Sequence, residues 1–221
     1  MISDPQLPQA VLFDMDGTLV DTEPMWVATE AEVAASFGHT WTVEDQRYCL
    51  GASATTVAAY IAERTGTRTP QGEIIDMMYA AVARRMAEGP ALRPGAKELL
   101  AELDALGVPM ALVTSTYRSL LGAALGGIGD HYFTVTVAGD EVAHTKPHPE
   151  PYLKAARLLG ADPRRCVAVE DSPTGAASAQ AAGCTVVAVP HAAPVPEAER
   201  RYVISSLEEI DAAWLGRVAR S

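Results

Sequence analysis

The apolar run Ala10-Val11-Leu12-Phe13 is followed at once by Asp14-Met15-Asp16-Gly17-Thr18. A short apolar run of this kind predicts a buried strand, and Gly17 is typical of the turn that ends it. Two carboxylates are therefore expected at the carboxyl end of a strand, which is where open α/β sheets bind their ligands. Two acids in one crevice cost stability unless a cation or a reaction needs them. This feature predicts an α/β fold whose functional site lies at that edge of the sheet.

The remainder of the chain divides into two parts of different character. Between residues 20 and 91 only helical patterns occur, with Thr22 as a candidate N-cap, whereas from residue 92 onward strands and helices alternate as in a parallel sheet. We predict a Rossmann-like core, residues 1–19 and 92–221, with an inserted all-helical cap domain, residues 20–91. The expected strands are 10–13, 109–113, 133–138, 166–169, 185–189 and 202–204, and the expected helices are 23–37, 53–64, 70–87, 94–106, 117–125, 149–159, 174–182 and 207–215.

Composition excludes several classes of partner. The net charge of −11 argues against nucleic acid and anionic membranes, since both demand basic patches. The sequence contains no apolar stretch near the roughly 20 residues of a membrane span, and its polar start does not predict a secretory signal. Cys49, Cys166 and Cys184 are too scattered for a disulfide framework or a zinc site, so buried thiols are expected. We expect a cytoplasmic monomer or weak homodimer that acts on a small molecule.

Polar side chains stand at the ends of further predicted strands. Thr114 and Ser115 end the second strand, Lys146 lies in the loop after the third, and Glu170 and Asp171 end the fourth. Each of these alone could be a turn residue, a helix cap or a surface lysine. Because parallel strands place their carboxyl ends on one edge, all of them are expected to meet the two aspartates of the first strand in one crevice.

These residues resemble the haloacid dehalogenase superfamily of phosphotransferases, over nearly the whole chain. Asp14 to Thr18 resembles the first motif of that family, Thr114 the second, Lys146 the third, and Glu170-Asp171 the fourth. The helical insertion resembles the cap of the subgroup that holds β-phosphoglucomutase and many sugar-phosphate phosphatases. The resemblance implies a Mg²⁺-dependent phosphatase that hydrolyses a small phosphomonoester, such as a sugar or polyol monophosphate.

The chemistry of such an enzyme assigns a role to each motif. A carboxylate can attack phosphorus and form an acyl phosphate, and Asp14 is the expected nucleophile. Asp16, the next side chain on the same strand face, can protonate the leaving oxygen and then deprotonate the attacking water. Lys146 supplies positive charge against the phosphate and the nucleophile, and Thr114 donates a hydroxyl to a phosphoryl oxygen.

The expected metal and substrate sites share these residues. Mg²⁺ prefers oxygen ligands, and the resemblance implies Asp14, Asp171 and the backbone carbonyl of Asp16 as direct ligands. Adjacent side chains on a strand point to opposite faces, so Glu170 is expected to act through a water or to orient its neighbours. The substrate-binding positions expected around the phosphoryl group are Met15, Gly17, Thr18 and Ser115, and those expected towards the leaving group are Trp26 and Arg118.

Two other functions remain open at this point. The sugar phosphomutases of the subgroup carry basic residues in the cap, but the matching positions here are Trp26, Leu50 and Ala54, and Tyr117 replaces a lysine after the second motif. These departures favour hydrolysis over a mutase of the β-phosphoglucomutase type. Dehalogenases lack the second aspartate, so Asp16 indicates phosphate chemistry. A non-catalytic phosphate- or metal-binding protein is the remaining alternative.

Overall fold

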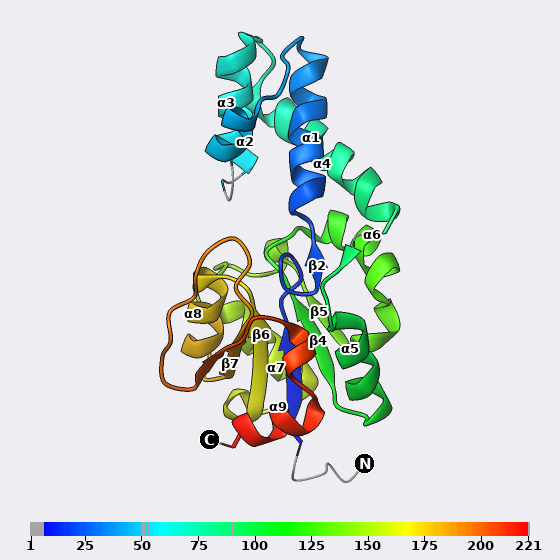
Figure 1. Ribbon diagram of the computed structural model, residues 1–221, viewed down its shortest axis with the longest axis vertical. Coiled ribbons are helices and arrows are strands. Elements are labelled where there is room, and N and C mark those ends of the chain that lie inside the picture. The colour runs from blue at the N-terminus through cyan, green and yellow to red at the C-terminus, as the bar shows by residue number, and fades with distance from the viewer. Residues whose placement is uncertain (1–6, 50–51, 53, 90, 221) are drawn as a thin grey trace.

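A six-stranded parallel sheet forms the centre of the molecule (Figure 1). The computed structural model describes residues 7–49, 52, 54–89 and 91–220. The strand order is β5-β4-β1-β6-β7-β8, so the chain builds outward on one side of β1 and then on the other. The predicted Rossmann-like parallel sheet is confirmed. The strands are β1 (Ala10–Phe13), β4 (Met110–Val113), β5 (Val135–Val137), β6 (Cys166–Glu170), β7 (Thr185–Ala188) and β8 (Arg201–Val203).

This strand order places a topological switch point between β1 and β6. The connection from β1 leads to β4, whereas the later strands β6, β7 and β8 follow on the opposite side of β1. Ligands of open α/β sheets bind in the crevice at the carboxyl ends of the strands flanking such a point. The two aspartates that follow β1 therefore stand at the position where this architecture opens a binding site.

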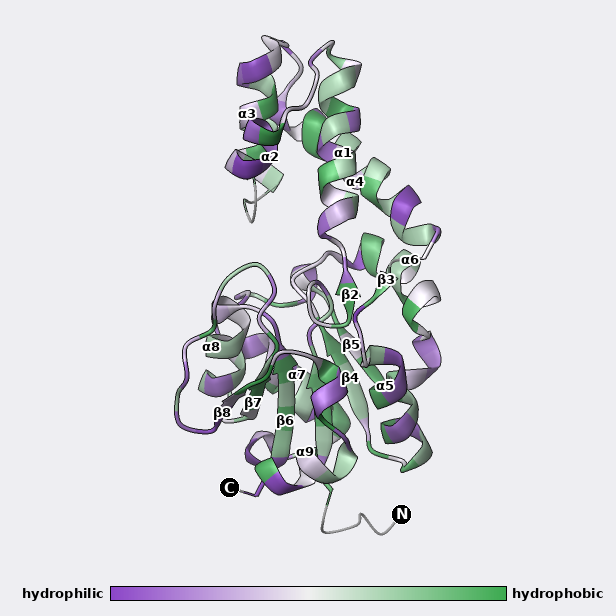
Figure 2. Ribbon diagram, viewed as in Figure 1, coloured by the Kyte–Doolittle hydropathy of each residue, from purple (hydrophilic) through white to green (hydrophobic). Residues whose placement is uncertain are grey.

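Helices cover both faces of the sheet, and side chains alternate between them. Val11 and Phe13 pack into one core cluster, and Ala10 and Leu12 into the other, as the period of a strand requires. All four are fully buried, which explains the continuous apolar run. Figure 2 shows the sheet as hydrophobic and the surrounding helices and loops as more hydrophilic. The first face is covered by α5 (Ala96–Ala105), α6 (Arg118–Ile128) and α9 (Ala212–Val218), and the second by α7 (Glu150–Leu159) and α8 (Pro173–Ala181).

The helical insertion forms a separate body beyond the carboxyl edge of the sheet (Figure 1). Its own core contains Val33, Ile61, Ile74 and Met78 among other buried side chains. The two chain crossings pair as a short antiparallel ribbon, β2 (Val20–Asp21) with β3 (Ala91–Leu92). The predicted division at residues 20 and 91 falls at this ribbon and stays a prediction. The helices are α1 (Glu23–Ser36), α2 (Val43–Cys49), α3 (Ala54–Thr65) and α4 (Gln71–Ala87).

Three elements differ from the sequence-based expectation. The ribbon β2–β3 and helix α2 were not predicted, although Thr42 and Asp45 form a reciprocal cap at the start of α2, with Thr42 N–H donating to Asp45 at 2.8 Å and Asp45 N–H to Thr42 at 3.2 Å. The expected last helix is split into a 3₁₀ turn, Leu207–Glu209, and α9, because the Asp211 side chain caps α9 at Trp214 N–H. No helix in the described ranges combines the length and the apolar character that a membrane crossing requires.

Candidate active site

The Lys146 side chain contacts the carboxyl ends of three neighbouring strands. Its Nζ donates to Asp14 Oδ1 at 2.6 Å, to Glu170 Oε1 at 2.6 Å and to the carbonyl oxygen of Val113 at 2.9 Å. Asp14 directly follows β1, Val113 ends β4 and Glu170 ends β6, while Lys146 reaches in from the loop between β5 and α7. The structure thus brings together the residues of the first, third and fourth predicted motifs.

Burial and charge act against each other in this cluster. Burial raises the pKa of Asp14 well above its ordinary value, although the Lys146 charge opposes that rise. Burial also raises the pKa of Asp171 to about 7, with the neighbouring Glu170 adding to the effect. Burial disfavours the charged form of Lys146, but the carboxylates of Asp14 and Glu170 raise its pKa above the ordinary value, so it remains an ammonium. One cation therefore faces three carboxyl groups.

This excess of acid fits a divalent cation. Oxygen atoms of Asp14, Glu170 and Asp171 lie within 4.8 Å of one another. Hard cations such as Mg²⁺ take carboxylate oxygens as ligands, and a bound cation would offset the burial and mutual repulsion that raise the pKa values of Asp14 and Asp171. Glu170 is the most enclosed of the three, because it is fully buried. It also accepts hydrogen bonds from the Tyr152 hydroxyl at 2.6 Å and the Ser172 hydroxyl at 3.2 Å. The acidic cluster can hold a metal ion.

Asp16 is held by three hydroxyl groups from two segments. Thr22 donates to Oδ1 at 2.9 Å, while Thr114 and Thr116 donate to Oδ2 at 3.2 and 2.7 Å. Thr114, which was predicted to contact the phosphoryl group, thus donates its hydroxyl to Asp16, the predicted proton-transfer residue. Thr22 precedes α1 but makes no side-chain cap, because its hydroxyl is used here. Sequence reasoning missed Thr116, for which the signal was its position two residues beyond Thr114 at a strand end.

The turn after β1 packs tightly against the fourth motif. Gly17 has a φ of +81°, and a Cβ at this position would overlap the carboxylate of Asp171. Thr18 is fully buried and donates to Asp14 Oδ2 at 3.1 Å. The Met15 side chain is fully buried in the core, so only the backbone of Met15 is available to a phosphate. A glycine is required at residue 17 by both conformation and space.

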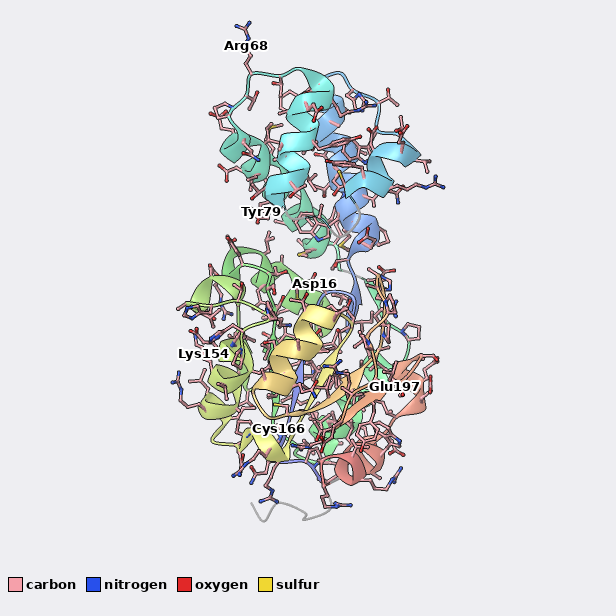
Figure 3. The ribbon with its side chains drawn as sticks, turned by 90° about the vertical axis from the view of Figure 1, so that its left-hand side faces the viewer. Asp16, Arg68, Tyr79, Lys154, Cys166 and Glu197 are labelled. Atoms are coloured by element: carbon pink, nitrogen blue, oxygen red, sulfur yellow. The ribbon has the colours of Figure 1, made fainter. Side chains whose placement is uncertain are left out.

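A cavity of about 560 Å³ lies between the core and the helical insertion. Figure 3 shows Asp16 at the end of the core that faces the insertion, with Tyr79 of α4 on the other side. The walls include Asp16, Gly17, Ser115 and Asp171 from the core and Trp26 from α1. Asp14 is not part of the cavity lining and keeps 6% of its surface exposed. Two predicted substrate-binding side chains, those of Ser115 and Trp26, therefore do face the cavity.

Arg118 lies apart from this cavity, although we predicted that it binds substrate. Its guanidinium donates to both oxygens of Glu141, at 3.0 and 2.6 Å, and to the Thr136 hydroxyl at 2.8 Å. It is not among the described residues that line the cavity. A guanidinium engaged by a carboxylate in this two-pronged way is committed to a structural pairing at the start of α6. The contact with Glu141, 23 residues away, was not visible in the sequence pattern.

Comparison with known proteins agrees with this geometry. A model of the family described as haloacid dehalogenase-like hydrolases matches residues 11–189. The chain belongs to this family. Protein CbbY of Rhodobacter capsulatus is 37% identical over 193 residues, covering 82% of this chain and 85% of that protein. Hexitol phosphatase A of Escherichia coli is 35% identical over 212 residues, covering 90% and 91%.

A solved structure of the same family has the same architecture. The crystal structure of CbbY from Rhodobacter sphaeroides in complex with phosphate superposes with a TM-score of 0.75 at 31% identity, covering 92% of this chain and 96% of that one. The predicted membership of the haloacid dehalogenase family is thereby confirmed, together with the prediction of a hydrolase with an α/β core.

Proposed function

We propose that the protein is a Mg²⁺-dependent phosphatase that hydrolyses a small sugar or polyol monophosphate through a phospho-aspartate on Asp14. The observation that carries this proposal is the position of the Lys146 ammonium, 2.6 Å from Asp14 Oδ1. Asp16, two residues after Asp14 in the sequence, lines the cavity beside this pair. The predicted enzyme class, a phosphoric monoester hydrolase, is confirmed by relatives named as phosphatases, and the name of hexitol phosphatase A supports a sugar or polyol phosphate as substrate.

The reaction has two steps on this chain's own residues. A carboxylate oxygen of Asp14 attacks phosphorus, and the bond from phosphorus to the leaving oxygen breaks while Asp16 gives that oxygen its proton. Asp16 then takes a proton from water, which attacks phosphorus and releases Asp14 as a carboxylate. Lys146 holds positive charge beside the transferred group throughout.

A cation bound by Asp14 and Asp171, with Glu170 close by, would supply charge neutralisation for the phosphoryl oxygens. Lys146 alone cannot balance the acids present, because its ammonium contacts Asp14 and Glu170 and a third carboxyl group, that of Asp171, lies close to both. Mg²⁺ suits the all-oxygen donor set, and the carbonyl of Asp16 is proposed as a further ligand.

Residues 20–91 are proposed to act as a cap that excludes bulk water. The cavity is lined from both sides, by Asp16 and Asp171 of the core and by Trp26 and Tyr79 of the insertion. The ribbon β2–β3 is the connection about which such a cap would open. Water excluded from the cavity strengthens the charge interactions at the phosphoryl group.

The lining of the cavity favours a single phosphate over a bisphosphate. None of its described residues is a lysine or an arginine. Trp26, Ala54 and Tyr117, at positions where the mutases carry basic groups, all line the cavity, while Leu50 lies outside the described residues. A mutase must hold a second phosphate, so hydrolysis is the better proposal. We further propose a cytoplasmic monomer or weak homodimer without nucleic-acid or membrane partners.

Phosphate release from a panel of sugar, polyol and nucleotide monophosphates, with p-nitrophenyl phosphate as a general probe, tests the proposal. We expect Mg²⁺-dependent hydrolysis that is lost in Asp14→Asn and kept in Asp104→Asn, which changes an exposed aspartate of α5. Interconversion of glucose 1- and 6-phosphates without phosphate release would overturn it in favour of a mutase. Phosphate or metal binding without turnover would leave the non-catalytic alternative.

A further inference from the structure

Glu30 is a buried acid that the catalytic steps do not use. It lies on α1, keeps 6% of its surface exposed and lines the cavity. Within the described part of the chain its carboxyl group has neither a hydrogen-bond partner nor an ion-pair partner. Burial raises its pKa to about 7, and the charge of Glu23 adds to that rise. A buried polar group without a partner costs stability, so its presence calls for a ligand.

The position of Glu30 on α1 places it far from the phosphoryl site. Glu23, Trp26 and Glu30 all line the cavity, and their spacing of three and four residues puts them on one helix face. Glu23 begins α1 next to Thr22, whose hydroxyl donates to Asp16. Seven residues correspond to about 10 Å along a helix, so Glu30 lies that much further into the insertion.

The surroundings of Glu30 restrict what it can bind. Cys49, Val57 and Met78 also line the cavity, from the core of the insertion. Burial raises the pKa of the Cys49 thiol to about 12, and the nearby Glu30 contributes, so Cys49 is an uncharged neighbour. A second phosphate would meet carboxylates and no lysine or arginine among the described lining residues. A hydroxyl group suits either form of Glu30, because a carboxylate accepts from it and a protonated carboxyl can also donate to it.

We infer that Glu30 is a specificity-determining residue whose carboxyl group hydrogen-bonds a hydroxyl at the end of the leaving group remote from the phosphate. The inference rests on the proposed function and narrows it to substrates with a hydroxyl-bearing chain long enough to reach from Asp16 past Trp26. Trp26 then packs against the apolar side of the substrate's carbon chain, and Glu30 hydrogen-bonds the hydroxyl at its far end. A substrate without the distal hydroxyl leaves the buried carboxyl group unpaired, and this is the basis of discrimination.

Kinetics of Glu30→Leu, with three phosphates as substrates, test this role. The substrates are glucitol 6-phosphate, its analogue 1-deoxyglucitol 6-phosphate and p-nitrophenyl phosphate, whose leaving group carries no hydroxyl beyond the ester oxygen. We expect kcat/KM for glucitol 6-phosphate to fall about 10- to 100-fold in Glu30→Leu. The values for the deoxy analogue and for p-nitrophenyl phosphate should stay within about threefold of wild type. Glu30→Gln, which still offers a carbonyl acceptor, should recover most of the loss.

Glu32→Leu is the matched control. Glu32 lies on the same helix but outside the cavity, where it pairs with Arg84 and Arg85, so its replacement should leave the substrate preference unchanged. Hydrolysis of p-nitrophenyl phosphate by each variant reports that the protein is folded and catalytically intact.

The outcomes separate the two proposals. No Asp14-dependent phosphate release from any substrate would overturn the proposed function itself. Normal hydrolysis of p-nitrophenyl phosphate, with the same ratio of kcat/KM for the two glucitol phosphates in wild type and Glu30→Leu, would overturn the role of Glu30 alone. A Glu30-dependent preference for 1-amino-1-deoxyglucitol 6-phosphate over glucitol 6-phosphate would also overturn it, since Glu30 would then select an ammonium.

Discussion

The Thr116 hydroxyl donates to Asp16 Oδ2 across 2.7 Å, from the turn that follows the neighbouring strand β4. Thr22 holds the other oxygen of Asp16 from the segment that leads into the helical insertion. The proposed proton-transfer residue is thus fixed at the same time by the core and by the cap linker. Such bonds restrict the carboxylate to one rotamer, which matters because proton transfer depends on the direction of the carboxyl group.

Replacing Thr116 by valine should therefore slow the reaction. Thr116 lines the cavity, and valine keeps the shape of its side chain there. We therefore expect Thr116→Val to lower kcat about tenfold with a smaller change in KM, because Asp16 loses its shortest hydrogen bond. Steady-state phosphate release measures both constants. Thr116→Ser should recover wild-type kcat, and Thr134→Val, at an exposed position before β5, is the control. A kcat equal to that of wild type in Thr116→Val would contradict this role.

Lys146 should be essential for both activity and stability. Removal of its ammonium in Lys146→Met leaves Asp14 and Glu170 buried without their cation, which costs about 3–5 kcal/mol in the free energy of unfolding of the metal-free protein. We also expect kcat to fall at least about a thousandfold, since the charge beside the transferred group is lost. Urea unfolding and single-substrate kinetics measure the two effects. Lys97→Met, on the exposed surface of α5, should change neither.

The sequence allowed the sheet and the acidic cluster to be predicted because both follow from local pattern and one rule of topology. The apolar run before Asp14 identifies a strand buried on both faces, and parallel strands place Asp14, Lys146 and Glu170 at one edge. The residues that were missed depend on contacts between distant segments. Thr116 reaches Asp16 across 100 residues, and Arg118 is engaged by Glu141, which no periodicity reveals.

The acid Glu30 shows a second reason why sequence reasoning falls short. A glutamate in a helical pattern is ordinarily a solvated residue, and its neighbour Glu32 is indeed exposed and ion-paired. Only the packing of α1 against the other helices of the insertion encloses Glu30 in a cavity. Both faces of α1 carry acids. The sequence of the helix alone therefore does not show which face another part of the chain will enclose.

Two glycines with the same backbone conformation should respond differently to alanine. Gly17 and Gly38 both have a φ of +81°, so the backbone conformation alone makes either substitution cost about 1 kcal/mol in the free energy of unfolding. A Cβ at Gly17 would overlap Asp171, whereas Gly38 has open space around it. We expect Gly17→Ala to lose most of its phosphatase activity and Gly38→Ala to keep it. Equal activities would contradict the packing of the first motif against the fourth.

Removal of the metal should abolish turnover and reduce stability. Excess chelator is expected to stop phosphate release. Added Mg²⁺ at 100 times its dissociation constant should stabilise the folded protein by about 2.7 kcal/mol, which is measured as a higher melting temperature. Asp171→Asn should lose this increment, because the acidic cluster then has one carboxylate fewer. Asp104→Asn, away from the cluster, should respond to Mg²⁺ as the wild type does. An unchanged increment in Asp171→Asn would exclude Asp171 as a ligand.

The unusual pKa of Glu30 should appear in the pH dependence of stability. Its pKa is about 7 in the folded protein against 4.5 in the unfolded chain, since burial disfavours the charged form. Its contribution to the free energy of unfolding is therefore complete below pH 4.5, declines as the pH rises and is lost above pH 7. With a discount for screening in the cavity, the decline amounts to about 2 kcal/mol.

Glu30→Gln carries no such titration and serves as the reference in this experiment. Urea unfolding of wild type and Glu30→Gln between pH 5 and pH 8, without substrate or metal, should show the wild type losing about 2 kcal/mol relative to the variant. Glu32→Gln should follow the wild type, because Glu32 is exposed and its pKa is lowered by its hydrogen bond to Arg85. Parallel stability curves for wild type and Glu30→Gln would show that Glu30 ionises as freely in the folded protein as in water, and a buried acid waiting for a ligand hydroxyl would then no longer explain its place in the cavity.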